Sequence, residues 1–155
     1  MYKKILVPLD GSTQAECVIP HLETIAKTGV KDIELISVIE PVEIPTRGKI
    51  ALSEDDLKKI TLEAKKDTHK YLDQVAARLT RSGIKVHPII LTGKPAESLI
   101  DYIDSNDIDL VIMATHGRSG LNRLFWGSVA EKVVRAVNAP VLLIKNQSCG
   151  PCMVE

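Results

Sequence analysis

Short apolar runs alternate along this chain with stretches that carry helix signals, and this alternation constrains the fold more than any other feature. The runs cover residues 5–9, 33–39, 84–91, 109–114 and 141–144. The uninterrupted run at residues 5–9 is typical of a strand buried on both faces, and the other four, mostly apolar segments also indicate strands. Strands that alternate with helices build a parallel sheet with helices on both faces. The sequence therefore predicts a doubly wound α/β domain with a five-stranded parallel sheet.

Helix signals fill the intervals between these runs. Ser12 and Ser53 are placed to cap the first two helices, and Pro95 suits the first position of the third. The first helix is expected to reach about Lys27, and a fourth helix to start at Ser128 and end near residue 137.

The topology of the sheet decides where a ligand would bind. In open parallel sheets, ligands bind beyond the carboxyl ends of the strands, at the point where the strand order reverses. With the order 3-2-1-4-5, the strands at residues 5–9 and 109–114 flank that point. Asp10 and the segment 114–127 would then face each other across it.

The segment MATHGRSGLNRLFWGSVAEK, residues 113–132, is longer and more basic than a simple turn requires. Its glycines permit backbone conformations that bring the chain close to a ligand. Gly127 and Ser128 lie where a helix begins, so unpaired N–H groups and a positive dipole end would suit a phosphate. The alternative is structural, because Ser128 to Glu131 also matches a capping box, which stabilises a helix without any ligand. The pattern alone leaves both interpretations open.

Charge and hydropathy argue against several classes of function. Lysine plus arginine (20) equals aspartate plus glutamate (20). A nucleic-acid surface or a polybasic membrane binder would need a clustered basic excess. No apolar run approaches the roughly 20 residues that span a bilayer. The first residues show no signal-peptide cleavage site, so we expect a cytoplasmic protein with neither nucleic-acid nor membrane partners.

Three separated segments resemble the universal stress protein family. They are ILVPLDGS at residues 5–12, the glycine-containing segment described above, and APVLLIK at residues 139–145. Nucleotide-binding members of that family carry the motif G-x2-G-x9-G-[ST] after the fourth strand. Gly117, Gly127 and Ser128 match this motif. Ala114 takes the place of its first glycine, which would add one methyl group beside the ligand.

The resemblance extends over residues 1–145 and implies one nucleotide-binding domain over residues 1–146, followed by a flexible tail over residues 147–155. The tail contains the motif CGPC, from Cys149 to Cys152. In thiol-redox proteins such a motif precedes a helix whose N-terminus lowers the pKa of the first thiol, but only three residues follow it here. An idle tail, a reversible disulfide and a metal site shared by two tails remain open. Cys17 lies in a helix pattern and is expected to pack in the core.

The resemblance also implies roles for individual residues around an adenine nucleotide. Asp10 would accept a hydrogen bond from a ribose hydroxyl and could hold Mg²⁺ through a water, while an Asx turn is its structural alternative. The expected contacts are Pro8, Leu9, Asp10 and Val38 around adenine and ribose, Met113 and Ala114 on the floor, His116, Gly117 and Arg118 near the phosphates, and Gly127, Ser128, Val129 and Ala130 at the helix start.

These features predict a protein that binds ATP, or ADP or AMP, together with Mg²⁺. Hydrolysis requires a positioned nucleophile, and neither Asp10 nor His116 comes with a recognisable partner. We therefore expect a sensor or regulatory binder with slow or no hydrolysis rather than a true enzyme. The resemblance further implies a homodimer joined through the edge strand 141–144. The alternatives are a dimeric member that lost nucleotide binding through Ala114 and acts through protein interactions, a thiol-redox protein, and a flavin binder of similar topology.

Overall fold

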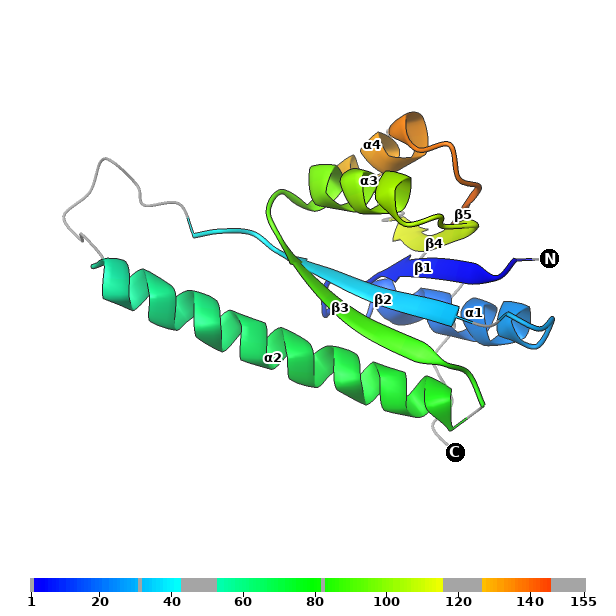
Figure 1. The fold of residues 1–155 in the computed structure, drawn as a ribbon, viewed down its shortest axis with the longest axis horizontal. Coiled ribbons are helices and arrows are strands. Elements are labelled where there is room, and N and C mark those ends of the chain that lie inside the picture. Colours follow the sequence, from blue (N-terminus) through cyan, green and yellow to red (C-terminus); the bar gives the residue numbers. More distant parts are fainter. Residues whose placement is uncertain (1, 31, 43–52, 82, 116–126, 146–155) are drawn as a thin grey trace.

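The computed structural model describes residues 2–30, 32–42, 53–81, 83–115 and 127–145. Within them the chain forms five strands, four α-helices and one 3₁₀ helix (Figure 1). In chain order they are β1 (Lys4–Pro8), η1 (Ala15–Val18), α1 (Ile19–Ala26), β2 (Asp32–Ile39), α2 (Glu54–Thr80), β3 (Val86–Thr92), α3 (Pro95–Ser105), β4 (Leu110–Thr115), α4 (Ser128–Ala136) and β5 (Val141–Lys145).

All the strand pairings are parallel, and the order across the sheet is β3-β2-β1-β4-β5. This order confirms the predicted doubly wound fold. β1 pairs with β2 as far as Pro8, opposite Ile36. Its pairing with β4 is limited to Ile5 and Leu6. The two central strands therefore part before their carboxyl ends, which leaves room at the reversal point of the strand order.

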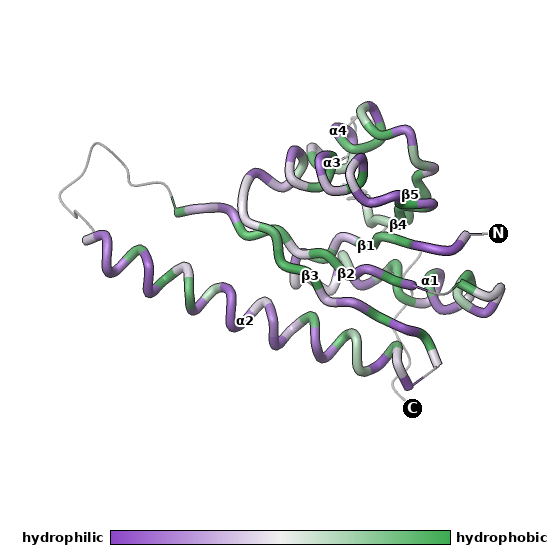
Figure 2. Tube along the Cα trace, in the orientation of Figure 1, coloured by the Kyte–Doolittle hydropathy of each residue, from purple (hydrophilic) through white to green (hydrophobic). Residues whose placement is uncertain are grey.

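Alternation along the strands sends apolar side chains to two separate cores. On one face, Leu35 and Ile112 pack with residues of η1, α1 and α2. On the other face, Leu6 and Val111 pack with residues of α3 and α4. Figure 1 shows these two groups of helices on opposite sides of the sheet, and Figure 2 shows the apolar residues concentrated along the strands. Each such fully buried leucine, isoleucine or valine contributes about 1.5–3 kcal/mol, so both faces stabilise the same sheet.

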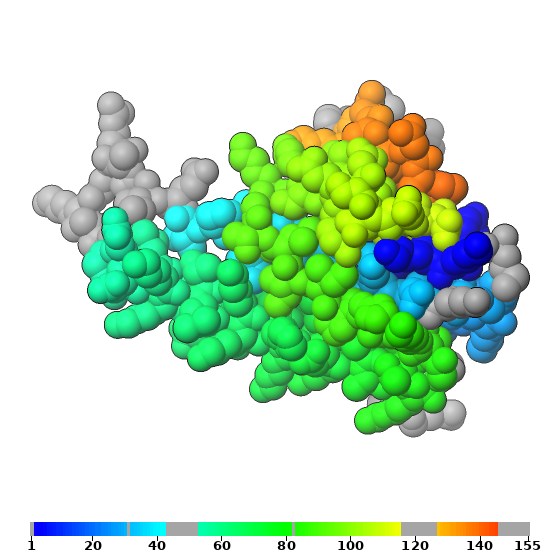
Figure 3. Space-filling model, in the orientation of Figure 1, coloured from blue at the N-terminus to red at the C-terminus, as the bar shows by residue number. Residues whose placement is uncertain are grey.

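The long helix α2 begins with a capping box at Ser53, the cap that the sequence predicts. Ser53 Oγ accepts a hydrogen bond from the Asp56 N–H at 3.1 Å, and Asp56 Oδ2 accepts one from the Ser53 N–H at 3.3 Å. Only the second half of α2 packs into the core, through Leu72, Val75 and Leu79. Its first turns extend beyond the sheet (Figures 1 and 3). No helix in the described part of the chain is both long and apolar enough to cross a membrane.

Most boundaries lie within one residue of the sequence prediction, and two element starts differ by more. Ser12 Oγ accepts a hydrogen bond from the Ala15 N–H at 3.1 Å, but the turn that follows is the 3₁₀ helix η1. The α-helix begins only at Ile19 because Pro20 has no N–H, so α-helical hydrogen bonding cannot pass through it. β3 begins at Val86, two residues after the predicted start, and Gly83, three residues earlier, turns the chain with a φ of 79°.

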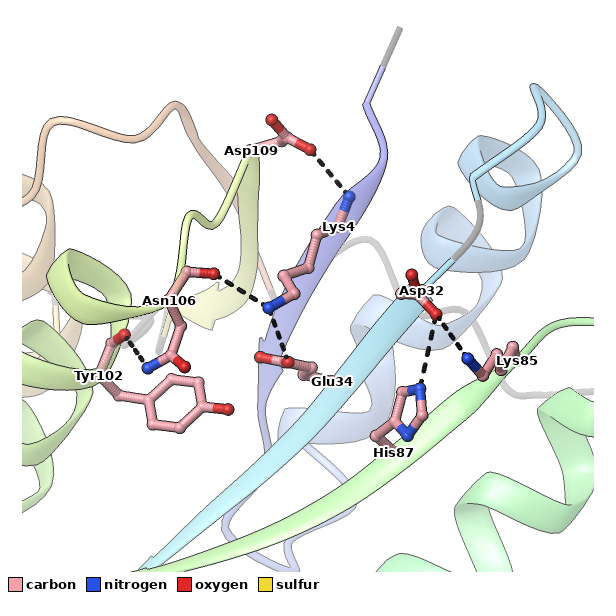
Figure 4. A network of polar contacts seen from close by, with 8 residues as sticks. All are labelled: Lys4, Asp32, Glu34, Lys85, His87, Tyr102, Asn106 and Asp109. Carbon is pink, nitrogen blue, oxygen red and sulfur yellow. Dashed lines mark hydrogen bonds and ion pairs between the residues drawn. The ribbon is translucent and has the colours of Figure 1, made fainter.

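A polar network joins β1, β2 and α3 at the amino ends of the strands (Figure 4). Lys4 Nζ lies 3.3 Å from Glu34 Oε1 and donates to the Asn106 carbonyl oxygen at 3.0 Å. Because Glu34 is only 7% exposed, this ion pair compensates a largely buried charge. Asp109 Oδ2 accepts hydrogen bonds from the backbone N–H groups of Lys4 and Lys3, both at 2.9 Å. These bonds hold the pKa of Asp109 below its ordinary value.

Candidate functional site

A cavity of about 450 Å³ opens at the carboxyl ends of β1, β2 and β4. It lies at the reversal point of the strand order, where a ligand is expected in an open parallel sheet. Its volume falls within the range of small-molecule sites, about 300–1,000 Å³. The lining residues are Pro8, Leu9, Asp10, Ala15, Ile36, Val38, Glu40, Pro95, Leu99, Met113, Ala114, Gly127, Ser128, Val129 and Ala130.

Ten of the thirteen residues that the sequence assigns to a nucleotide line this one cavity: Pro8, Leu9, Asp10, Val38, Met113, Ala114, Gly127, Ser128, Val129 and Ala130. The other three, His116, Gly117 and Arg118, lie outside the described residues. The fold therefore brings together every described member of the predicted set, while their individual roles stay predictions.

Five lining residues lie outside the predicted set: Ala15, Ile36, Glu40, Pro95 and Leu99. Ile36 and Glu40 share one side of β2 with Val38, so the two-residue period of a strand would have found them. Ala15, Pro95 and Leu99 reach the cavity only because η1 and α3 pack against the sheet beside it. No local pattern in the sequence predicts where these two helices pack.

The wall built by β2 and α3 is apolar. Ile36, Leu99 and Met113 belong to one buried cluster, and Val38 packs against it. Val38 also directs its peptide N–H and C=O toward the cavity. The backbone pairing of β1 with β2 ends where the Leu9 N–H donates to the Ile36 carbonyl oxygen at 2.8 Å, and alternation then aims the Val38 peptide groups past the end of β1. An apolar slot with strand-end peptide groups suits a flat heteroaromatic ring.

Asp10 leaves β1 at the mouth of the cavity and forms an Asx turn. Its Oδ1 accepts hydrogen bonds from the Ser12 N–H at 2.9 Å and from Ser12 Oγ at 2.6 Å. Gly11, between them, adopts a φ of 83°, a conformation that favours glycine. The structural alternative for Asp10 is thus confirmed, yet the same residue is exposed and lines the cavity. The turn fixes this carboxylate relative to the end of β1.

The first turn of α4 presents backbone donors at the other side of the cavity. Gly127 is the N-cap, with φ −53° and ψ 140°, and Ser128 is the first helical residue. The capping box suggested by Ser128 to Glu131 is therefore wrong, because such a box needs serine at the N-cap. No side chain caps this helix, and Glu131 instead accepts a hydrogen bond from Arg135 Nε at 3.1 Å. The first N–H groups and the positive end of the helix dipole thus remain beside the cavity.

The two helices beside the cavity are linked to each other. Lys132 Nζ of α4 lies 3.2 Å from Glu97 Oε1 of α3. The pKa of Glu97 is lowered by a hydrogen bond from its own backbone N–H and further by Lys132.

Gly93, just before α3, has a φ of 149°, and a Cβ there would lie 2.6 Å from Ser98 Oγ. The positive φ therefore favours glycine here, whereas the Ser98 hydroxyl could rotate away from a Cβ.

Ala114, which replaces the first glycine of the family motif, has an ordinary strand backbone. Among the described residues other than glycine, only Asp107 has a positive φ. Met113 points to the face covered by α3 and α4, whereas Ala114 packs on the opposite face, against the cluster that contains Ala15 of η1. Its methyl group is therefore directed away from the first turn of α4.

The described residues include no group of three or more His, Cys, Asp or Glu side chains that could hold a metal ion.

Burial, together with the nearby Glu16, raises the pKa of Tyr71 well above its ordinary value. Its hydroxyl therefore stays protonated at neutral pH and cannot act as a base. Cys17 is 3% exposed in the core, as predicted. The cysteines at 149 and 152 lie outside the described residues.

Comparison with known proteins establishes the family. Residues 1–145 match the model of the universal stress protein family. The chain belongs to this family. Universal stress protein MJ0577 of Methanocaldococcus jannaschii is 32% identical to it over 162 residues, which cover 96% of this chain and 98% of the relative.

Solved structures agree with this assignment. The structure of MJ0577, a hypothetical protein whose biochemical function was assigned from its structure, aligns with a TM-score of 0.80 at 29% identity, over 96% of this chain and 99% of that one. A universal stress protein in complex with cAMP aligns with a TM-score of 0.67 at 20% identity, over 94% and 98% of the two chains. A family member from Arabidopsis thaliana with AMP bound gives 0.63 at 19% identity, over 92% and 91%. The last two likenesses concern the fold alone.

Proposed function

We propose that this universal stress protein binds an adenine nucleotide, ATP in the first place and ADP or AMP as alternatives. It acts as a sensor or regulatory binder that hydrolyses the nucleotide slowly or not at all. The observation that carries this proposal is the cavity at the reversal point of the sheet, which collects the described members of the predicted nucleotide set.

The two sides of the cavity match the two halves of a nucleotide. The first turn of α4 offers uncapped N–H groups, a positive dipole end and the Ser128 hydroxyl, which suit phosphate oxygens. The opposite wall offers the apolar surfaces of Val38 and Leu99, which suit a purine ring. Asp10 lies between them at the end of β1, where a ribose hydroxyl would donate to its carboxylate. The cAMP and AMP found in relatives support the same ligand class.

Mg²⁺ would enter with the triphosphate rather than occupy a site of its own. Magnesium is usually held by one or two carboxylates together with substrate phosphates and waters. Asp10 supplies a carboxylate at the cavity mouth, and the described residues lack a larger cluster of ligands. The bound ion would offset phosphate charge, while Asp10 would hold it through a water.

The homodimer and the cytoplasmic location belong to the same proposal. Among the described strands, β5 has a neighbour on one side only, β4, so its other edge is available for pairing. Leu142 on this strand is 37% exposed, and pairing with a second copy would bury it. A particle of twice 17.0 kDa in light scattering would support the dimer, and a monomer would refute it.

The deciding experiment is calorimetric titration of the purified protein with Mg²⁺-ATP, combined with mass spectrometry of any nucleotide that co-purifies. Ser128→Asp is the informative variant. An aspartate in the first turn of a helix interacts favourably with the dipole, so the melting temperature should stay equal or rise. The same charge would repel phosphates, so affinity for ATP should fall by about tenfold or more, equivalent to about 1.4 kcal/mol or more.

Ser128→Asn is the matched control, because it has the size of aspartate without the charge. It should retain affinity within a few-fold of the unmodified protein. An absence of ATP binding at millimolar concentration would overturn the proposed function. Equal affinities of the aspartate and asparagine variants would show that the phosphates do not lie at the start of α4.

A further inference from the structure

Glu40 is a charged lining residue that the nucleotide prediction does not use. It follows directly on β2, and its side chain shares one side of the strand with Ile36 and Val38. With a rise of about 3.3 Å per residue, it lies about 7 Å beyond Val38 toward the cavity mouth. Glu40 is exposed, and none of the ion pairs among the described residues involves it.

The position of Glu40 assigns it to the base end of the cavity. An anionic phosphate chain is attracted to the positive end of α4, on the β4 side of the sheet. Glu40 directly follows β2, which lies on the other side of β1 from β4, and it lines the cavity next to the wall that Val38 and Leu99 complete. A phosphate group beside Glu40 would meet a like charge, whereas the polar edge of a base would meet a hydrogen-bond acceptor.

The chemistry of a carboxylate then discriminates between purines. An ionised carboxylate only accepts hydrogen bonds. The 6-amino group of adenine donates, whereas the 6-oxo group of hypoxanthine presents an acceptor, and two acceptors repel each other. The Val38 C=O, aimed at the same cavity, can also accept from the amino group, so Glu40 adds to the discrimination against an analogue that cannot donate.

Building on the proposed nucleotide function, we propose that Glu40 selects 6-aminopurines by accepting a hydrogen bond from the exocyclic amino group of the base. Glu40 is then a specificity-determining residue of the cavity. The phosphate end, which includes Ser128, contributes affinity without regard to the base.

The test compares the affinities of ATP, ITP and GTP, each with Mg²⁺, for the unmodified protein and for Glu40→Gln. The unmodified protein should bind ATP about tenfold or more tightly than ITP, the range expected of a hydrogen bond to a charged group. Glutamine keeps the size of glutamate, but its amide can donate to a 6-oxo group. The ATP-to-ITP ratio of Glu40→Gln should therefore fall by about threefold or more.

Glu63→Gln, an exposed substitution on α2, is the matched control and should keep the ratio of the unmodified protein. If ATP binds but Glu40→Gln leaves the ATP-to-ITP ratio unchanged, this inference is overturned and the proposed ATP binding is retained. A preference of the unmodified protein for ITP or GTP overturns the inference as well. If the folded protein binds no nucleotide at all, both are overturned.

Discussion

Ala114→Gly is the substitution that separates a nucleotide binder from a family member that has lost its ligand. The change restores the first glycine of the family motif. If the Ala114 methyl group blocked the ligand, its removal would increase the affinity for ATP about tenfold or more. The structure predicts no such gain, because the methyl group packs toward η1 on the opposite face from the start of α4. We expect the affinity to change by less than about twofold.

The same substitution should instead lower stability. Glycine in a strand costs roughly 0.5–1 kcal/mol relative to alanine, because its unfolded chain has more freedom to lose. Ala114 is half-buried, so about half of the roughly 0.8 kcal/mol for a buried methyl group is lost as well. The sum is about 1–1.5 kcal/mol. For a domain of this size it corresponds to a melting temperature lower by about 2–6 °C.

Urea unfolding measures the stability, and calorimetric titration with Mg²⁺-ATP measures the affinity. Ala139→Gly is the matched control, because this half-buried alanine precedes β5 at the opposite end of the sheet. Both variants should lose comparable stability, and neither should gain affinity. A tenfold gain confined to Ala114→Gly would refute the reasoning and show that the methyl group does limit nucleotide binding.

Two further predictions concern the network at the amino ends of the strands (Figure 4). Lys4→Met leaves the 7% exposed Glu34 without its cation and should lower the free energy of unfolding by roughly 1–3 kcal/mol in urea. Adding Glu34→Leu should recover most of that loss, and no recovery would contradict the ion-pair argument. Asp109→Asn tests pH dependence: since the pKa of Asp109 is lowered on folding, its stabilisation is present above the ordinary aspartate pKa and is lost as pH falls through the lowered value. The variant should therefore be less stable at pH 7 by at most about 1 kcal/mol, and the difference should shrink as the pH falls below the ordinary aspartate pKa.

The elements of the fold could be predicted from the sequence because each carries a local signal. The mostly apolar segment at residues 33–39 is short and rich in isoleucine and valine, which favours a strand over a helix, and it lies in β2. Ser53 and Pro95 mark helix starts through the same backbone geometry in any protein, and both helices begin beside them. The predicted helix start at Ser128 is confirmed, and only the alternative of a capping box there is wrong, because the path of the backbone makes Gly127 the N-cap.

The site could be predicted only in part. Asp10, Val38 and Ser128 carry signals of position or motif, and all three line the cavity. Pro95 and Leu99 carry no such signal, because they reach the cavity only when α3 returns across the sheet. Glu40 falls between these cases, since its register with Val38 is visible in the sequence but its place at a cavity mouth is not.

The sequence by itself determined the class of fold, the order of its elements and the family of this protein, because apolar periodicity, caps and motif spacing are local properties of the chain. The tertiary structure alone decided that Ala15, Pro95 and Leu99 complete the cavity, that Ala114 faces away from α4, and that Glu40 stands at the end opposite the helix dipole. These depend on how β1, β2 and β4 part at their carboxyl ends. Distances between residues far apart in the chain are set by packing the two cores onto one sheet.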